Sequence, residues 1–449
     1  MDQNLLARYG APVPRYTSYP TAPHFHPAVN AASYRQWLGR IGAEDSLSLY
    51  LHVPFCSRLC WYCGCHTKLV RQYQPIADYA ELLAAEIGLV AAAIPARPRV
   101  PHVHWGGGTP TMLAPDDFER LMAELRERFH LAKEAEVAIE IDPRGLTAAK
   151  VAALAASGVT RASLGVQDFT PAVQQAINRI QPFEVTADAV ERLRAAGIAG
   201  INLDIMYGLP HQSVADAVRT ADLAADLAPD RLAVFGYAHV PWMKTHQRMI
   251  DEAALPDAAA RLVQSEAMAA RLIERGYRRI GLDHFARPAD AMARALAAGR
   301  LRRNFQGYST DEAGQLIGFG ASSIGALAEG YVQNAVPVGA YGKTIRDGAL
   351  AVTRGIALSP DDRLRRAVIE RLMCDLAVDL AAVTSELAQP QADFSAELAA
   401  LAPLAADGLI VLDGPRIAVT ESGRPFVRAV CARFDRYLAS GRARHSRAV

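Results

Sequence analysis

Short apolar runs alternate with amphipathic stretches from residue 47 onward, and this alternation restricts the possible folds more than any other feature of the chain. Apolar residues that recur every 3.6 positions indicate helices, whereas short apolar runs bounded by turn residues indicate buried strands. The predicted strands are 47–53, 102–105, 137–141, 163–166, 201–206 and 231–235, and the predicted helices are 77–94, 115–129, 148–156, 185–196 and 214–227. Strands and helices in strict alternation predict a parallel sheet that closes into a full or partial barrel.

The two ends of the chain do not follow this alternation. Residues 1–45 are rich in aromatic residues and proline, and we expect them to form an arm that packs on the main domain. Near the other end, residues 361–387 have a helical pattern, and two apolar runs around Asp413-Gly414 predict a hairpin. The expected organisation is an arm at 1–45, a barrel with an extension at 46–358, and a small, mainly helical, winged-helix-like domain at 359–449.

Charge and hydropathy exclude several classes of protein. The formal net charge is +1, which gives no overall reason to expect nucleic-acid binding, so a packing role is expected for the last domain. The N-terminal residues lack the apolar segment of a signal peptide, and the longest apolar runs are too short to span a bilayer. We therefore expect a cytoplasmic protein whose thiols stay reduced.

Four of the six cysteines lie within ten residues of one another, at Cys56, Cys60, Cys63 and Cys65. Thiolates are ligands for iron–sulfur clusters and for zinc. Three thiolates can hold three irons of a four-iron cluster and leave the fourth iron open to another ligand, as in catalytic metal sites. A Cys₄ zinc site is the alternative, but such sites usually pair two cysteine arms from distant segments, and no second arm is present. Disulfides are a further alternative, although nothing in the sequence indicates an oxidising compartment.

Each predicted strand is followed either by polar side chains or by glycines that leave the backbone accessible. In order these are the cysteine loop, the glycines 106–108 with Thr109, Glu140, Gln167, Asp204 and the pair 237–238. The carboxyl ends of barrel strands meet on one rim, where the chemistry of such folds takes place. A glycine triplet alone is more often a tight turn, yet glycine also lets a ligand approach the backbone closely. The sequence therefore predicts one site on this rim.

The spacing Cys-x₃-Cys-x₂-Cys, just after the apolar run 47–53, resembles the signature of radical S-adenosylmethionine (SAM) enzymes. The resemblance implies a [4Fe–4S] cluster whose open iron binds the amino and carboxylate groups of SAM, which is then split into methionine and a 5′-deoxyadenosyl radical. It also implies that Arg179 binds the methionine carboxylate, since a guanidinium grips a carboxylate through two hydrogen bonds. Without this resemblance, Arg179 would be read as one of many surface arginines. Glu140 and Asp204 would then be read as ion-pair partners of nearby arginines.

A longer set of motifs resembles the oxygen-independent coproporphyrinogen III oxidases of bacterial haem synthesis. The motifs lie at 50–65, 104–111, 140–144, 165–169, 202–210, 237–239, 283–287 and 303–308, and the match extends from the arm to the region of Cys431. The resemblance implies an incomplete parallel βα barrel that binds one cluster and two SAM molecules. The implied reaction is the oxidative decarboxylation of two propionates of coproporphyrinogen III to vinyl groups, which gives protoporphyrinogen IX.

The family's functional residues carry over by position. The cluster ligands implied are Cys56, Cys60 and Cys63. The residues implied for one SAM are Tyr50, Gly107, Glu140 and Ile324, and those for the other are Tyr62, Gly108, Thr109, Gln167, Arg179, Asp204 and Ala238, with Phe305 and Gln306 near one of them. Cys65, Tyr50 and Glu140 are the expected catalytic residues. The pair Trp61-Tyr62 departs slightly from the Tyr-Phe type of pair usual at this place.

The expected partners follow from the same resemblance. The substrate carries four carboxylates, so arginines near the mouth of the barrel, such as Arg15, Arg302 or Arg303, are candidates to hold it. A reduced flavodoxin- or ferredoxin-type protein is the expected electron donor, and the chain is expected to be a monomer. A related radical SAM protein that binds haem without decarboxylating is the alternative within the superfamily, and Cys65 and the arm argue against it. A zinc-stabilised scaffold or winged-helix regulator is the alternative from another class.

Overall fold

The computed structural model describes residues 3–438 and is built around one large mixed sheet. Its strands are β1 (Ser46–Val53), β4 (Arg99–Gly107), β5 (His130–Ile141), β6 (Arg161–Gln167), β7 (Gly200–Tyr207), β8 (Arg231–Gly236), β9 (Arg278–Ile280), β10 (His284–Ala286), β13 (Gln315–Phe319), β14 (Ile324–Ala326), β15 (Gly330–Asn334) and β16 (Val352–Ala357). Their order is β16-β15-β14-β13-β1-β4-β5-β6-β7-β8-β10-β9. The strands from β13 to β8 pair in parallel, and those beyond them on either side are antiparallel. Because β16 and β9 are the two edges, the barrel is incomplete.

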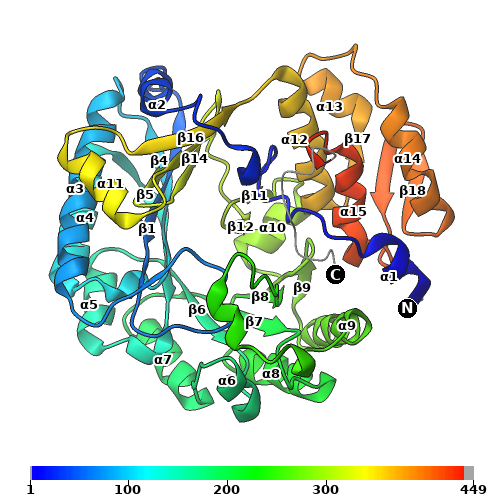
Figure 1. Ribbon diagram of the computed structural model, residues 1–449, viewed down its shortest axis with the longest axis horizontal. Coiled ribbons are helices and arrows are strands. Elements are labelled where there is room, and N and C mark those ends of the chain that lie inside the picture. Colours follow the sequence, from blue (N-terminus) through cyan, green and yellow to red (C-terminus); the bar gives the residue numbers. More distant parts are fainter. Residues whose placement is uncertain (1–2, 439–449) are drawn as a thin grey trace.

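Helices cover the outer face of the parallel strands (Figure 1). They are α3 (Gln74–Ala93), α4 (Pro115–Arg128), α5 (Ala148–Ala156), α6 (Pro171–Ala176), α7 (Phe183–Ala195), α8 (Val214–Asp226), α9 (Ala258–Glu274) and α11 (Val338–Arg346). Leu47, Leu49 and Leu51 of β1 are fully buried in the core with these helices, whereas the intervening Tyr50 belongs to the opposite face. The incomplete barrel and the six predicted strands are confirmed, although β5 begins seven residues before its predicted start at 137 and β4 is longer than predicted at both ends.

The sequence analysis did not predict the antiparallel strands at either edge or the helix α10 (Ala291–Ala297). Strand β14 has only three residues, and one of them is a glycine. A segment this short shows no periodicity, because its pairing depends on neighbours that are distant in sequence. The extension of the barrel therefore could not be resolved from local pattern.

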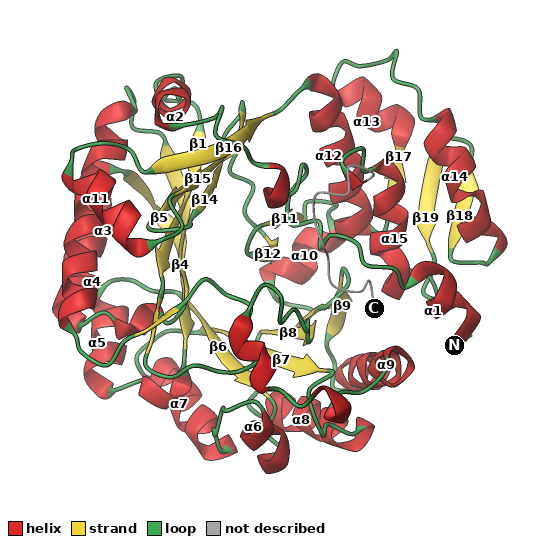
Figure 2. Ribbon diagram, viewed as in Figure 1, coloured by secondary structure: helices red, strands yellow, loops and turns green. Residues whose placement is uncertain are grey.

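The C-terminal region contains a second small sheet among helices (Figure 2). Its elements are α12 (Pro360–Asp375), β17 (Ala377–Asp379), α13 (Leu380–Glu386), α14 (Ser395–Ala406), β18 (Ile410–Asp413), β19 (Arg416–Val419) and α15 (Val427–Cys431). The hairpin predicted at Asp413-Gly414 is present, with Asp413 paired to Arg416. The prediction of continuous helix over 361–387 is wrong in its middle. Leu376 ends α12 with a positive φ of 57°, and β17 then pairs with β19, a partner that local periodicity cannot reveal.

The N-terminal arm crosses the open side of the barrel (Figure 1). It contains α1 (Gln3–Tyr9), a 3₁₀ turn at Ala22–His24 and α2 (Ala31–Leu38). Tyr9, Tyr16 and Tyr19 are buried in the C-terminal core, whereas Trp37 is buried in the barrel core. The arm thus contacts both parts of the molecule. The boundaries 1–45, 46–358 and 359–449 stay a prediction, and residues 1–2 and 439–449 lie outside the described residues. Within residues 3–438, no helix has both the length and the apolar character needed to cross a membrane.

Glu86 of α3 is a buried carboxyl group that joins several elements of the barrel wall. The N–H of Gly320 and the side-chain amide of Asn334 donate to it, each over 2.6 Å, and the hydroxyl of Tyr341 donates over 2.7 Å. Only 2% of Glu86 is exposed. Burial raises the pKa of Glu86 to about 7, against an ordinary value of 4.5.

We expect this carboxyl group to make stability depend on pH. Between about pH 4.5 and 7 the folded protein binds a proton that the unfolded chain releases, so the free energy of unfolding falls as pH rises through this window. The full change is on the order of 3 kcal/mol. Glu86→Gln, which cannot titrate, is expected to lose this part of the pH dependence. Thermal unfolding of both proteins from pH 5 to 8 measures it, and identical pH profiles would contradict the assignment.

Candidate functional site

The cysteine loop begins directly after β1 and is closed by a short parallel ladder of β2 (Phe55–Cys56) and β3 (Lys68–Leu69). Cys60 is buried, Cys56 and Cys63 are partly buried, Cys65 is exposed, and all four thiols are free. The glycine triplet at the end of β4 allows the loop to sit against this strand. A Cβ atom on Gly108 would lie 2.6 Å from the carbonyl oxygen of Phe55, too close for any side chain.

Guanidinium and hydroxyl groups lie beside two of the three predicted ligand thiols. The guanidinium groups of Arg144 and Arg179 lie 3.6 and 3.5 Å from the sulfur of Cys60, and the hydroxyl of Thr109 lies 3.5 Å from that of Cys56. Hydrogen bonds from the thiol and backbone N–H of Cys65 lower the pKa of Cys63 to about 6, although burial opposes this. Burial raises the pKa of Cys56 to about 11.

The donor set fits a polynuclear cluster better than a single metal ion. In the part of the chain that the structure describes, no three His, Cys, Asp or Glu side chains converge as ligands of one ion. Three thiolates that each bind a different iron of a four-iron cluster do not need to converge in this way. The loop provides free thiols for such a cluster. Two guanidinium groups lie close enough to offset the negative charge of a thiolate-bound cluster.

A segment far away in sequence holds the cysteine loop by its backbone carbonyls. Lys244 donates to the carbonyl of Cys65 over 2.8 Å, and His246 donates to that of Cys63 over 2.8 Å. Gln247 donates to the carbonyls of Tyr62 and Ala238 over 2.9 and 3.2 Å. Gln247 thereby bridges Tyr62 and Ala238, two of the predicted site residues. The sequence analysis assigned no role to Lys244, His246 or Gln247, because their contacts span about 180 residues and leave no local signal.

Tyr50, His52 and His66 form a chain of hydrogen bonds beside the cysteine loop. The hydroxyl of Tyr50 lies 2.9 Å from Nδ1 of His52, and Nε2 of His52 lies 3.1 Å from the carbonyl oxygen of His66. A carbonyl only accepts, so Nε2 carries the proton and Nδ1 accepts from Tyr50. Burial lowers the pKa of His52, which keeps the ring neutral, and burial raises the pKa of Tyr50. Tyr50 is thereby held in one orientation.

Glu140 lies at the end of β5, next to Tyr50 and the glycine triplet. Its Oε2 accepts a hydrogen bond of 3.0 Å from the N–H of Gly107, and its Oε1 lies 3.4 Å from Nε2 of His104. A Cβ atom on Gly106 would lie 2.8 Å from Oε1 of Glu140 and 3.0 Å from the ring of Tyr50. Tyr50, Gly107 and Glu140 therefore form one contiguous group. Ile324 adjoins it across β13, since its carbonyl packs over Gly318, the partner of Tyr50.

Gln167, Arg179 and Asp204 lie farther along the same rim. A Cβ atom on Gly165 would lie 3.0 Å from the amide nitrogen of Gln167 and 3.2 Å from Nη2 of Arg179, so both side chains meet there. Arg179 is 5% exposed and donates to the carbonyl of Gly165 over 2.6 Å. Its Nε has no hydrogen-bond partner among residues 3–438. Burial, and next the charge of Glu140, raise the pKa of Asp204 to about 6, although Ser163 and Asn202 donate to it.

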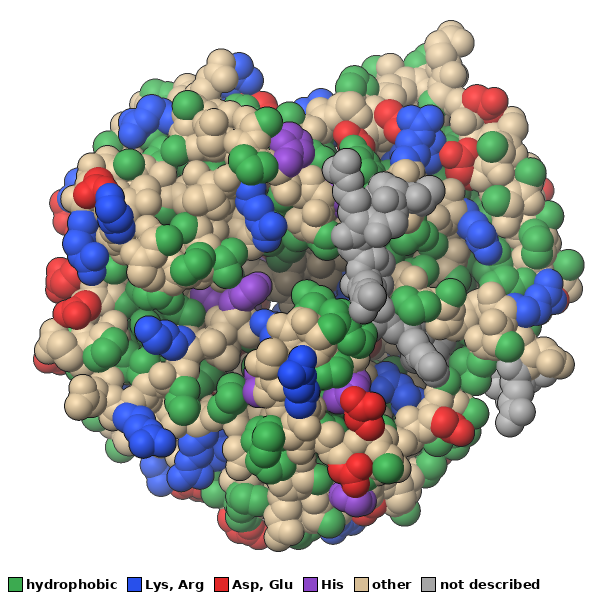
Figure 3. Space-filling view, viewed as in Figure 1, with side chains coloured by type: hydrophobic (Ala, Val, Ile, Leu, Met, Phe, Trp, Pro, Cys, Tyr) green, Lys and Arg blue, Asp and Glu red, His purple; other side chains and the backbone are tan. Residues whose placement is uncertain are grey.

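A cavity of about 750 Å³ opens where the carboxyl ends of the barrel strands approach the C-terminal region. Figure 3 shows the hollow in the middle of this face. Four predicted site residues line it: Cys65, Ala238, Phe305 and Gln306. Phe305 and Gln306 form the turn between β11 (Arg302–Asn304) and β12 (Gly307–Ser309).

Only two of the three arginines expected to hold the substrate line this cavity. Arg15 and Arg303 do, whereas Arg302 is exposed and is absent from the cavity wall. Of the three candidates, Arg302 is therefore the one that does not reach this cavity. Arg302 and Arg303 are consecutive residues of β11, so their side chains point to opposite faces of the hairpin, and only one of them faces the cavity.

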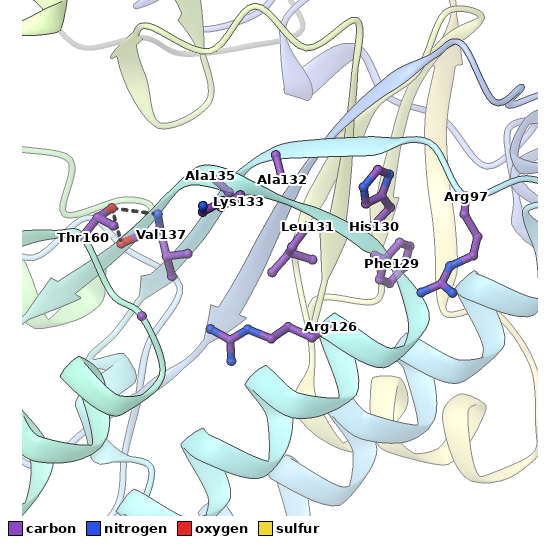
Figure 4. Close-up of a pocket in the computed structure, with 11 residues that line it drawn as sticks. Arg97, Arg126, Phe129, His130, Leu131, Ala132, Lys133, Ala135, Val137 and Thr160 are labelled. Carbon is purple, nitrogen blue, oxygen red and sulfur yellow. Dashed lines mark hydrogen bonds between the residues drawn. The ribbon is translucent and has the colours of Figure 1, made fainter.

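A second cavity, of about 650 Å³, lies at the start of β5 (Figure 4). Its wall includes Arg97 and Arg126, which donate to the backbone carbonyls of Glu127 and Ser157. These arginines support loops, and β5 begins at this end of the sheet. The second cavity is therefore at the opposite end of the strands from the cysteine loop and belongs to no part of the predicted site.

Comparison with known proteins places these features in a family context. Residues 50–224 match the radical SAM superfamily, and residues 358–426 match the HemN C-terminal domain. The oxygen-independent coproporphyrinogen III oxidases of Bradyrhizobium diazoefficiens and Paracoccus denitrificans are 54% and 46% identical to this chain, over the full length of both proteins in each case. The solved structure of the coproporphyrinogen III oxidase HemN from Escherichia coli, a radical SAM enzyme, has a TM-score of 0.91 and 40% identity, and the match covers 97% of this chain and 99% of that one.

Proposed function

The chain belongs to the family of oxygen-independent coproporphyrinogen III oxidases, radical SAM enzymes, and from this premise we propose how its residues carry out the reaction. It decarboxylates two propionate side chains of coproporphyrinogen III to vinyl groups without oxygen and so forms protoporphyrinogen IX for haem synthesis. One observation supports this best. Cys65 and Ala238, two of the predicted site residues, line the same cavity as several positively charged arginines.

The cofactors of this reaction are a [4Fe–4S] cluster and SAM. When bound, they would supply a 5′-deoxyadenosyl radical, which takes a hydrogen atom from the β-carbon of a propionate and becomes 5′-deoxyadenosine. The substrate would then lose CO₂ and pass one electron to an external electron acceptor, which leaves a vinyl group. Cys56, Cys60 and Cys63 are the residues that would hold the cluster. The contacts from Lys244, His246 and Gln247 keep their loop in place, and the arm over the cavity excludes water.

The proposed enzyme binds two SAM molecules, and the support for this number is that the predicted site residues form two groups along the rim. Tyr50, Gly107, Glu140 and Ile324 form one contiguous group, and Tyr62, Gly108, Thr109, Gln167, Arg179, Asp204 and Ala238 follow the rim from the cysteine loop to the end of β8. Cys65, Tyr50 and Glu140 are proposed to act in catalysis, and Phe305 and Gln306 to adjoin one SAM. Equilibrium dialysis of SAM against the reconstituted protein tests the count, and one SAM per cluster would contradict it.

Arg179 is proposed to bind the carboxylate of SAM, because it is buried on the rim beside Cys60 and its Nε is unsatisfied among the described residues. A charge-assisted hydrogen bond contributes roughly 1.5–3 kcal/mol. Arg179→Ala is therefore expected to weaken SAM binding about 10- to 150-fold while the cluster remains. Equilibrium binding to reconstituted protein measures this. Arg192→Ala, which removes an exposed arginine paired with Asp188, is the control and should bind SAM normally.

The decisive experiment is an anaerobic assay of the reconstituted protein with coproporphyrinogen III, SAM and a reductant. Formation of protoporphyrinogen IX and 5′-deoxyadenosine is expected. Tight haem binding without vinyl product would instead support the haem-handling alternative. We further propose that the electron donor is a reduced flavodoxin- or ferredoxin-type protein and that the chain is a monomer. The proposed location is the cytoplasm, where thiols stay reduced.

A further inference from the structure

Gln167, the last residue of β6, has a backbone conformation that residues other than glycine rarely adopt. Its φ is +74°, and the N–H of Asp168 donates to the carbonyl of Val166 over 3.1 Å, so residues 166–168 form a three-residue turn. Three-residue turns with a positive φ at their centre are rare and strained. Such strain persists only where the surrounding structure enforces it, and it is concentrated at functional sites.

The turn interrupts the pairing of β6 with β7. Gly165 pairs with Asp204, and Gln167 pairs with the next residue, Ile205, so β6 has one extra residue at this point. A bulge of this kind redirects a side chain near an active site. Here the Gln167 side chain lies against Gly165, where a Cβ atom would be 3.0 Å from its amide nitrogen and 3.2 Å from Nη2 of Arg179. The bulged turn therefore accompanies a close approach of Gln167 to Arg179.

The side-chain amide of Gln167 is buried but makes no hydrogen bond with the described part of the chain. Gln167 is 9% exposed, and none of the hydrogen bonds within residues 3–438 involves its amide. The Nε of Arg179 is likewise unsatisfied within these residues. Buried polar groups nearly always have a partner. Two neighbouring side chains on the rim therefore retain hydrogen-bonding groups for a ligand.

The carboxylate of Asp168 holds the chain directly after the turn. Asp168 is 1% exposed, and its Oδ1 accepts from the N–H of Thr170 over 2.5 Å. Its Oδ2 accepts from the side-chain amide of Gln212 over 2.8 Å and from the hydroxyl of Thr220 over 3.0 Å. The same hydroxyl accepts from the N–H of Phe169 over 3.2 Å. Since Thr220 belongs to α8, this carboxylate fastens the end of β6 to the next βα unit.

A second part of this network holds the segment that carries Arg179. The side-chain amide of Gln174 donates to the carbonyls of Asp168 and Gln181, over 2.9 and 2.5 Å. The side-chain amide of Gln181 donates to the carbonyl of Gly165 over 3.1 Å, and Arg179 donates to the same carbonyl over 2.6 Å. Buried hydrogen bonds thus connect the turn at Gln167 to the segment of Arg179.

We propose, on the basis of the function proposed above, that Asp168 is a positioning residue whose carboxylate holds Gln167 in the strained turn, so that the Gln167 amide binds SAM beside Arg179. Asp168 does not touch SAM itself, because it is buried and its oxygens accept from three protein donors. It acts through the backbone of the neighbouring residue. The alternative is that Asp168 only fastens α8 to the sheet.

Thermal unfolding of the protein without SAM tests the strain. Glycine adopts a positive φ freely, whereas alanine does not. Gln167→Gly is therefore expected to unfold at a higher temperature than Gln167→Ala. Val411, an exposed residue of β18 without a positive φ, is the control position, and there glycine should give the lower unfolding temperature. A lower unfolding temperature for Gln167→Gly than for Gln167→Ala would contradict the strained turn.

Equilibrium binding of SAM to the cluster-loaded protein tests the positioning role. The affinity to compare is that of the SAM molecule whose binding Arg179→Ala weakens. Gln167→Ala is expected to weaken it about 2- to 13-fold, the range for loss of one neutral hydrogen bond, and Asp168→Asn is expected to have an effect in the same range. The double variant should lose no more than Gln167→Ala alone, because Asp168 acts only through that side chain.

Asp362→Asn is the matched control. Asp362 of α12 is 5% exposed and, like Asp168, accepts from one backbone N–H and two side chains, namely those of Ser359 and Tyr437. Its substitution should leave SAM affinity unchanged even where it lowers the unfolding temperature. Thr220 gives a second test that keeps the carboxylate. Thr220→Val removes one donor to Asp168 and should weaken SAM binding, whereas Thr220→Ser keeps the hydroxyl and should bind SAM as the wild type does.

Three results overturn the inference. They are wild-type SAM affinity in Asp168→Asn, losses that add in the double variant, and an equal loss in Asp362→Asn. If Asp168→Asn does not retain the cluster, equal SAM affinity in Thr220→Val and Thr220→Ser has the same consequence. Failure of the proposed function is distinct from these, since the wild type would then form no vinyl product in the anaerobic assay.

Discussion

Serine in place of Cys56, Cys60 or Cys63 is expected to abolish the iron–sulfur cluster, whereas serine in place of Cys65 is expected to retain it. Each of the first three thiols would hold one iron, and a hydroxyl is a poor substitute for a thiolate. These residues lie on one loop, which the β2–β3 ladder closes and which Lys244 and His246 hold by its backbone carbonyls. Cys65 is exposed and lines the cavity in which we propose that the substrate binds, so its loss should impair turnover instead.

Iron and sulfide content and the visible absorption of the anaerobically reconstituted variants measure this difference. Cys65→Ser serves as the internal control, because it changes the same loop by the same chemistry. The assignment would be wrong if Cys65→Ser lost the absorption while one of the other three variants kept it. The hydrogen bonds from Cys65 to Cys63 make this a demanding test, because a structural effect of Cys65 would be transmitted directly to a proposed ligand.

The barrel and its rim could be predicted from the sequence because both depend on local pattern. The run 47–53 appears as β1, and Glu140, Gln167 and Asp204 lie at or near strand ends on one rim, since parallel strands bring their carboxyl ends together. The cysteine spacing likewise places four thiols on one loop. These features need no information beyond a few neighbouring residues.

The features of the fold and the site that could not be predicted depend on contacts between segments distant in sequence. Gln247 holds the carbonyl of Tyr62 over an interval of 185 residues, and β17 pairs with a strand far along the chain. Arg428 lies near Arg15 and Arg303 only in the folded chain, and no local pattern indicates this. Arg302 and Arg303 were equal candidates in the sequence, because an exposed arginine and a cavity-facing arginine cannot be distinguished there.

Deletion of residues 1–24 is expected to leave a cluster-bearing protein that cleaves SAM slowly but forms no vinyl product. Pro12, Arg15 and Thr17 line the cavity, and Arg15 donates to the carbonyl of Gly236 at the end of β8 over 3.3 Å. The arm therefore covers the space in which the radical must be protected from water. The barrel core should survive the deletion, because its buried residues begin later in the chain, at Val29.

The alternative is that the arm mainly braces the molecule, because Tyr9, Tyr16 and Tyr19 are buried in the C-terminal core. Deletion of residues 1–10 separates the two roles. It removes α1 and the contact of Tyr9 with Asp407 but keeps every arm residue that lines the cavity. If the arm acts as a cover, this shorter deletion lowers the unfolding temperature yet still yields vinyl product, whereas the longer one yields none at equal iron content. Insoluble or cluster-free protein after the longer deletion would support bracing, and full decarboxylation after it would reject both roles, because neither a cover nor a brace can be removed without loss.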